Sequence, residues 1–198
     1  MRAYRRRVSH LPPVLSGLLA ATGGVWVVAE FRQSLRSRPD ARRPERGGRT
    51  VVVVPAAIGG ALALYLANVV PSLAVPNRVV AAWCALVVLW AAVALRLWSF
   101  RTLGRYFTFT VQTSIDQAVV TSGPYRFVRH PAYAALLLAA VAGGLLIGNW
   151  LSLVVFVGAV TAALVYRIRV EEKALEQDVG PAYLEYAATH KRLVPLVW

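Results

Sequence analysis

Long apolar runs separated by polar segments are the main pattern along this chain. A helix needs about 20 apolar residues to cross a bilayer, and three runs reach that length. Two shorter runs follow, and Gly148-Asn149 joins them as a tight turn, so they are expected to form a helical hairpin. The runs cover residues 11–31, 51–70, 79–98, 132–147 and 150–166. The pattern predicts an all-α fold, a polytopic membrane helical bundle of about five transmembrane helices.

The chain divides into two parts by this pattern. Residues 1–98 form an N-terminal transmembrane part with three spans and a basic loop at 32–50. Residues 99–198 contain an interfacial loop, the helical hairpin 132–166 and a charged C-terminal segment, 167–198. We expect this C-terminal segment to be helical and cytoplasmic, with a break at Gly180-Pro181.

Composition agrees with a membrane protein, because 58% of the residues are hydrophobic and the mean hydropathy is +0.55. A net charge of +13 would suggest nucleic acid as the partner of a soluble protein. Here the arginines cluster between apolar runs, where anionic membrane lipids explain them, so we expect no nucleic-acid partner. Cys84 is the only cysteine and the three histidines lack ligand spacing, so no metal site is predicted.

The positive-inside rule sets the expected orientation. With five spans and an outside N-terminus, the inside segments carry 17 basic residues against 5 outside. The hairpin base and the C-terminal segment should therefore face the cytoplasm. The four arginines near the N-terminus favour an alternative in which the first run is re-entrant. Arg96, one turn from the end of the third run, is expected to snorkel to the membrane surface.

The stretch from Gly123 to Tyr133, GPYRFVRHPAY, is the best candidate for a wall of an active site. Pro131 favours a helix start, which places His130 at a helix N-terminus, a position suited to anionic groups. The alternative is an interfacial helix cap, in which Arg126 and Arg129 meet lipid headgroups and His130 only bonds a loop.

The C-terminal segment supplies a second half of the candidate site. Arg167 and Glu171 are neighbours on one helix face at i and i+4, which a simple surface ion pair would also explain. Four acids lie within eight positions, in a chain with only nine, and a cationic ligand would account for that density. We predict that this segment folds back against the His130 loop. The acids are Glu171, Glu172, Glu176 and Asp178.

A cleft between the two halves would be lined by Tyr125, Tyr133, Tyr183 and Tyr186. Its acid would hold a cation, its aromatic faces a purine or a sulfonium, and its arginine an anion. Methyl transfer from S-adenosylmethionine needs such groups, although the spacing does not distinguish that donor from a dinucleotide.

The strings TSGPYRFVRHPAY, EEKAL after Arg167, GPAYLEY and KRLVP together resemble the isoprenylcysteine carboxyl methyltransferase family of membrane enzymes. They also look like the related phospholipid methyltransferases. The resemblance covers about residues 100–198. Two residues depart from the family pattern: Ala135 stands where Gly is usual, and Val179 where Phe is usual.

The resemblance implies an S-adenosylmethionine site on the cytoplasmic face, completed by the C-terminal segment, with S-adenosylhomocysteine as product. The acceptor would be lipid-like or isoprenoid, and the methyl group would go to a carboxylate or another nucleophile of its headgroup. Arg167 would orient the acceptor, and Arg167 and His130 are the candidate catalytic residues. By position in the motif, the cofactor-binding residues would be Gln112, Gln117, Ala118, Val119, Val120, Tyr125, His130, Pro131, Ala132, Tyr133 and Glu171.

Two other functions compete with this interpretation. Membrane sterol or steroid reductases that use NADPH share an RHP-Tyr block, but they usually carry Asn where Ala132 stands. A scaffold or lipid-binding protein would need no catalysis at all. The arginine-rich, lysine-poor composition favours a bacterial source, and hence the inner membrane.

Overall fold

The structure, a computed structural model, describes residues 11–34, 50–104, 119–194 and 198. In these ranges, four helices are long and apolar enough to cross a membrane, and a fifth, shorter helix is also apolar. The long ones are α2 (Pro13–Ser34), α3 (Thr50–Val69), α4 (Arg78–Leu103) and α6 (Trp150–Asp178), and the shorter one is α5 (Pro131–Ile147). The prediction of an all-α membrane bundle is confirmed.

Three short elements complete the described part of the chain. They are the 3-10 helices η1 (Pro71–Leu73) and η3 (Gly123–Arg126), and the helix α7 (Pro181–Thr189). The first apolar run forms one continuous helix of 22 residues, α2, which is long enough to span. This length supports a full span over the re-entrant alternative.

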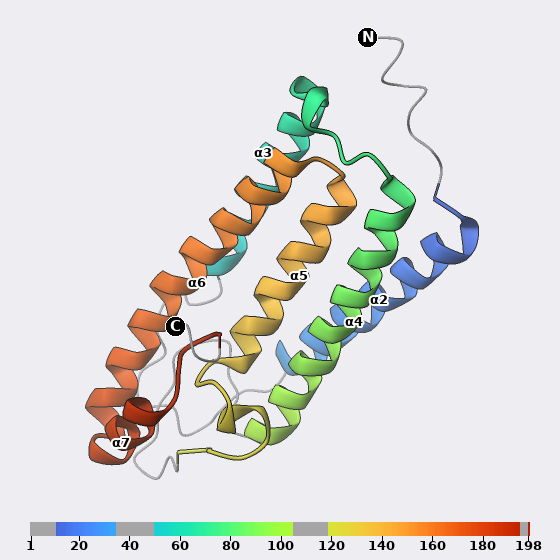
Figure 1. Ribbon diagram of the computed structural model, residues 1–198. Coiled ribbons are helices and arrows are strands. Elements are labelled where there is room, and N and C mark those ends of the chain that lie inside the picture. Colours follow the sequence, from blue (N-terminus) through green and yellow to red (C-terminus); the bar gives the residue numbers. More distant parts are fainter. Residues whose placement is uncertain (1–10, 35–49, 105–118, 195–197) are drawn as a thin grey trace.

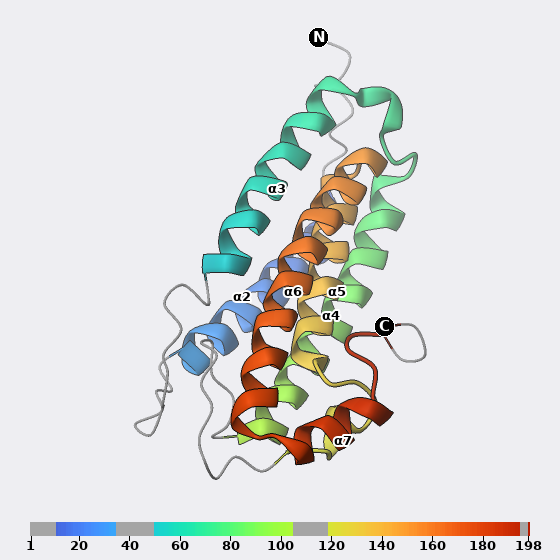
Figure 2. The same cartoon turned by 90° about the vertical axis from the view of Figure 1, so that its left-hand side faces the viewer.

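The helices form a slanted bundle in which α4, α5 and α6 lie side by side (Figures 1 and 2). Helix α3 packs against α6, while α2 crosses α4 on the other flank (Figure 1). Helix α3 comes close to α6 at Gly59, where an added Cβ would lie 2.6 Å from the Cβ of Ala159. The Ser152 hydroxyl also donates to the Ala63 carbonyl at 2.6 Å, so these two helices are held by close packing and a buried hydrogen bond.

The predicted hairpin of α5 and α6 is present, and its turn has a local cause. Gly148 ends α5 with φ of 74°, a left-handed conformation that favours glycine. Asn149 then caps α6 by accepting a hydrogen bond from the backbone N of Ser152 at 3.1 Å. The Asn149 amide also donates to the Val70 carbonyl at 2.8 Å, which ties this turn to the end of α3.

Helix α6 does not end where the sequence changes from apolar to charged. It continues without a break from Tyr166 through Asp178, and α7 begins at Pro181 after Gly180, whose φ is 69°. The hairpin and the first part of the charged segment therefore share one rigid helix, which carries Arg167 and Glu171 out of the apolar layer.

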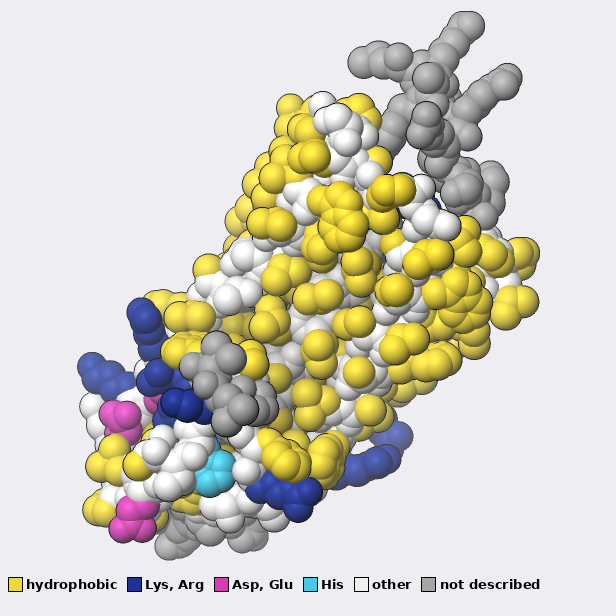
Figure 3. Space-filling view, in the orientation of Figure 1, with side chains coloured by type: hydrophobic (Ala, Val, Ile, Leu, Met, Phe, Trp, Pro, Cys, Tyr) yellow, Lys and Arg dark blue, Asp and Glu magenta, His cyan; other side chains and the backbone are white. Residues whose placement is uncertain are grey.

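Charged side chains gather at one end of the molecule (Figure 3). The visible face of the bundle is largely hydrophobic, whereas Lys, Arg, Asp, Glu and a histidine surround the base of α6 and the helix α7 (Figures 1 and 3). Both predicted halves of the site lie at this end.

Candidate active site

The start of α5 positions the first half of the site. Pro131 begins the helix, as predicted, and His130 is its N-cap. The His130 carbonyl accepts hydrogen bonds from the backbone N atoms of Tyr133 and Ala134, both at 3.0 Å. The imidazole of His130 is buried and points to α6, where its Nε2 lies 3.2 Å from the Glu172 carboxylate.

The C-terminal segment folds back against this loop, as predicted. The backbone N of Arg129 donates to the Lys191 carbonyl at 2.8 Å, and the backbone N of His130 donates to the Arg192 carbonyl at 2.9 Å. Val128 and Lys191 form an isolated parallel β-bridge at the same place. The loop is therefore held between α6 and the chain after α7.

Glu172 is the centre of a buried charge cluster. Its Oε1 lies 3.1 Å from Nη1 of Arg129 and 3.2 Å from His130, and its Oε2 lies 2.7 Å from Nε of Arg192. The side chains of Glu172 and Arg129 are only 4% and 9% exposed. The alternative in which Arg129 meets lipid headgroups is therefore wrong, because this side chain turns inward to a carboxylate. Arg126, by contrast, is exposed.

This cluster also changes the interpretation of the acidic residues. Glu172 needs no cationic ligand, because the protein's own cations surround it. Sequence reasoning counted Glu172 among four acids that a cationic ligand would explain, but it did not predict the partners Arg129 and Arg192, which lie 43 and 20 positions away. The sequence contained one signal of a separate role for Glu172, which is that it directly follows Glu171. Two adjacent side chains on a helix point in different directions, so the two acids contact different neighbours.

A second cluster joins the two halves of the site directly. The Tyr133 hydroxyl donates to Oε2 of Glu171 at 2.5 Å and accepts from Nε of Arg167 at 3.2 Å. The Arg167 side chain is buried. Tyr133 of α5 thus lies between the two residues that helical spacing places on one face of α6, so the i and i+4 pair is part of a larger cluster.

Three more tyrosines surround these clusters. The Tyr186 hydroxyl donates to the Tyr125 carbonyl at 2.6 Å, which fastens α7 to η3. Burial raises the pKa of Tyr186 to about 12, although the nearby Arg129 opposes this. Burial also raises the pKa of Tyr125 and of Tyr183, and the negative charges of Glu171 and Glu172, respectively, add to the effect. These phenols are therefore neutral at physiological pH.

The structure thus brings most of the predicted residues together. Tyr125, the stretch from His130 to Tyr133, Arg167 and Glu171 all lie at the base of α5 and α6. Val119 and Val120 are half-buried in the segment before η3. Gln112, Gln117 and Ala118 lie outside the described residues.

Arg96 is another buried cation that the sequence placed wrongly. It was expected to snorkel outward, but it is 3% exposed and forms a 2.7 Å ion pair with Glu30. The partner is on α2, 66 positions away, so no local pattern reveals it. Because the Glu30 carboxylate already pairs with its guanidinium, the Arg96 side chain stays inside the bundle and does not extend to the membrane surface.

Comparison with known proteins gives one consistent family. The sequence model of the isoprenylcysteine carboxyl methyltransferase (ICMT) family matches residues 82–177. Protein-S-isoprenylcysteine O-methyltransferase A of Arabidopsis thaliana is 37% identical over 98 residues, covering 48% of this chain and 50% of that protein. The Saccharomyces cerevisiae protein-S-isoprenylcysteine O-methyltransferase is 37% identical over 90 residues, covering 44% and 38%. The chain spans about half the length of the curated relatives it matches.

Similarity in three dimensions extends further than similarity in sequence. The structure of the eukaryotic intramembrane Ras methyltransferase ICMT matches with a TM-score of 0.61, at 19% identity, over 98% of this chain and 71% of that one. At this identity the match shows the fold. This match in fold and the four long apolar helices together indicate an integral membrane protein.

Proposed function

We propose that the protein is an integral membrane methyltransferase of the isoprenylcysteine carboxyl methyltransferase family, because the model of that family matches residues 82–177 and its curated members are similar to this chain. It would transfer a methyl group from S-adenosylmethionine to a carboxylate on a lipid-like or isoprenoid acceptor. The observation that carries the proposal is the cluster of Tyr133, Glu171 and Arg167, because it joins an acid, an aromatic hydroxyl and a buried arginine at the end of the apolar layer.

The chemistry of these groups fits the proposed cofactor. A sulfonium is a cation, so the Glu171 carboxylate and the neighbouring tyrosine rings suit it. Two buried polar atoms, Nε of Arg129 and the Tyr183 hydroxyl, make no well-formed hydrogen bond in the described part of the chain, although the two side chains interact with each other. Buried donors are rarely left unpaired, and these would suit an anionic group such as the carboxylate of the cofactor's methionyl part.

The protein's contribution to the reaction would be positioning and exclusion of water. When bound, S-adenosylmethionine would supply an electrophilic methyl group for an acceptor carboxylate oxygen, with S-adenosylhomocysteine as the leaving group. A carboxylate needs no base, so no residue has to remove a proton. Arg167 would bind the acceptor anion, and its buried side chain makes that interaction strong.

His130 takes a narrower role in this proposal. Its imidazole is buried against Glu172 rather than beside Arg167. We therefore assign it to holding the loop before α5 against α6, as a positioning residue. The predicted cofactor contacts at Pro131, Ala132, Gln112, Gln117, Ala118, Val119 and Val120 remain part of the proposal.

The proposed orientation has the site facing the cytoplasm of a bacterial inner membrane. The excess of basic residues in the inside segments supports the orientation. A lipid or isoprenoid acceptor could then reach Arg167 sideways from the bilayer, since α6 leaves the apolar layer close to this residue.

Calorimetry on the purified protein in lipid nanodiscs would test the cofactor. We expect S-adenosylhomocysteine to bind and NADPH not to bind. Binding of NADPH alone would favour a reductase, and binding of neither ligand would favour a scaffold or lipid-binding protein. Either result would overturn the proposal.

A second assay would identify the bond that forms. Protein, methyl-labelled S-adenosylmethionine and either an S-prenylated cysteine or a bacterial lipid extract would be incubated together. A carboxyl methyl ester releases labelled methanol in mild base, whereas an N-methyl group does not. Label that resists base would contradict transfer to a carboxylate.

A further inference from the structure

The Arg96 guanidinium connects three helices inside the bundle. Its Nε and Nη2 donate to the two carboxylate oxygens of Glu30 in α2, at 2.7 and 3.2 Å. Its Nη1 donates to the backbone carbonyl of Ala132, in the first turn of α5, at 2.7 Å. Arg96 itself belongs to α4. One side chain therefore links α2 to the helix that begins at the candidate active site.

Ionisable groups inside a membrane helix are costly and usually serve a function. Glu30 is the only acidic residue in α2, α3, α4 and α5 together. It also lies outside residues 82–177, the part that matches the family. The two-oxygen geometry with Arg96 is the arrangement that a guanidinium and a carboxylate favour, and it fixes the plane of the guanidinium.

The third nitrogen of Arg96, Nη1, bonds the Ala132 carbonyl beside the candidate active site. Ala132 lies between His130 and Tyr133, and it packs against Phe100, over whose ring the guanidinium lies at 4.7 Å. A shift of the Ala132 carbonyl would carry Tyr133 with it, because both belong to the same helical turn. The Tyr133 hydroxyl is the group that joins Glu171 to Arg167. Small displacements of such groups are expensive in catalysis.

We propose that Glu30 is a positioning residue for this site: it orients Arg96 so that its Nη1 holds the Ala132 carbonyl, and the helix α2 thereby sets the place of Tyr133. The inference rests on the proposed function for its effect on binding, but its structural part can be measured separately.

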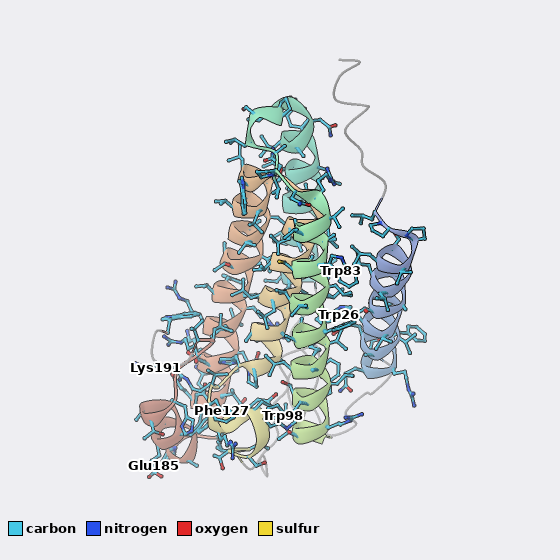
Figure 4. The ribbon with its side chains drawn as sticks, turned by 45° about the vertical axis from the view of Figure 1, so that its right-hand side comes forward. Trp26, Trp83, Trp98, Phe127, Glu185 and Lys191 are labelled. Atoms are coloured by element: carbon cyan, nitrogen blue, oxygen red, sulfur yellow. The ribbon has the colours of Figure 1, made fainter. Side chains whose placement is uncertain are left out.

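The rival explanation is that the ion pair only docks α2 onto α4. A second polar contact between these helices provides a matched control. Trp90 of α4 donates from Nε1 to the Thr22 hydroxyl of α2 at 2.9 Å. This contact makes no bond to α5 in the described residues. Figure 4 shows α2 beside α4, with Trp26, whose ring lies 5.9 Å from the Arg96 guanidinium, labelled between them.

The test compares Glu30→Gln, Arg96→Lys and Thr22→Val in the whole 198-residue chain in nanodiscs. The glutamine side chain keeps one acceptor oxygen but turns an amide N toward the guanidinium, and the lysine side chain cannot reach both partners at once. We expect the first two variants to bind S-adenosylhomocysteine about tenfold more weakly, as for one lost charge-assisted hydrogen bond. They should also show faster deuterium exchange at the backbone amides of the first turn of α5. Thr22→Val should match the wild type in both measurements.

A charge exchange separates positioning from docking. Glu30→Arg combined with Arg96→Glu restores an ion pair between the helices but puts no donor at the Ala132 carbonyl. We expect its melting temperature to recover relative to Glu30→Arg alone, while weak binding and fast exchange persist. Recovery of binding and exchange, or a Glu30→Gln variant that behaves like Thr22→Val, would overturn the proposal. If the wild type bound no S-adenosylhomocysteine, the proposed function would fail, and the exchange data would still decide the role of Glu30.

Discussion

The Tyr133 hydroxyl donates a hydrogen bond of 2.5 Å to Glu171, although the two residues are 38 positions apart and lie on different helices. The same oxygen accepts from Arg167 at 3.2 Å. The two polar blocks that the sequence separates are therefore one cluster, held at the point where α5 and α6 leave the apolar layer. If Tyr133 of α5 and Glu171 of α6 had been far apart, that distance would have contradicted the proposed site.

Tyr133→Phe should lower kcat/KM for methyl transfer roughly tenfold to a hundredfold. The change removes the hydroxyl that orders both charged groups, and a hydrogen bond to a charged group contributes about 1.5–3 kcal/mol. Steady-state assays would measure the effect. Tyr166→Phe is the control, since Tyr166 is largely exposed on α6. An unchanged rate for Tyr133→Phe would remove the hydroxyl from the mechanism.

Arg167→Ala should reduce turnover by roughly a hundredfold or more while cofactor binding stays close to that of the wild type, because removing one partner of a buried charge interaction costs several kcal/mol. Activity assays and calorimetry with S-adenosylhomocysteine would be run on the same preparation. Arg169→Ala is the matched control, because Arg169 is exposed on the same helix. Loss of cofactor affinity with full turnover at saturation would contradict the assigned role.

Glu171→Gln should have the opposite pattern. Removing the negative charge weakens the attraction to a cationic sulfonium, so S-adenosylmethionine should bind less tightly. The affinity for S-adenosylhomocysteine should change less, because its sulfur carries no charge. Comparing the dissociation constants of S-adenosylmethionine and S-adenosylhomocysteine measures that difference. Glu185→Gln, an exposed acid of α7, controls for net charge. Equal losses for both ligands would show that Glu171 does not sense the positive sulfur.

Glu172→Gln should destabilise the protein more than any of these changes. The carboxylate is buried against Arg129 and Arg192, and removing one partner of a buried charge cluster typically costs about 3–5 kcal/mol. Thermal unfolding in nanodiscs would measure it against Glu176→Gln, an exposed acid on the same helix. If the two variants melted together, the cluster around Glu172 would not be a structural centre.

Local rules predicted the helices well. Apolar length placed the spans, Pro131 marked the start of α5, and Gly148-Asn149 marked the hairpin turn. The end of α6 was less predictable, because a change from apolar to charged residues does not stop a helix. The helix runs on to Asp178, and the chain turns at Gly180, whose φ is positive.

The site was harder to predict, because its contacts come from distant segments. Helical spacing predicted that Arg167 and Glu171 share a face, and the fold-back of the C-terminal segment was also expected. The partners of Glu172 and Arg96 follow no periodicity, since they depend on how α2, α6 and the chain after α7 approach one another. Such pairings are set by tertiary packing.

Alkaline pH should release α7 from the site. The pKa of Tyr186 is about 12 in the folded protein, against about 10 in an unfolded chain. Because the folded value is higher, the stabilising contribution is fully present below pH of about 10 and is lost as the pH rises through the folded pKa. The pKa values of Tyr125 and Tyr183 are raised too, so ionisation of these two phenols adds to the loss of stability at high pH. Melting temperature should therefore fall between about pH 10 and 12, with tyrosinate absorbance appearing in the same range.

Tyr186→Phe loses the hydrogen bond to the Tyr125 carbonyl, so it should melt lower at neutral pH but depend less on alkaline pH. An equally steep decline in the variant would show that another group titrates.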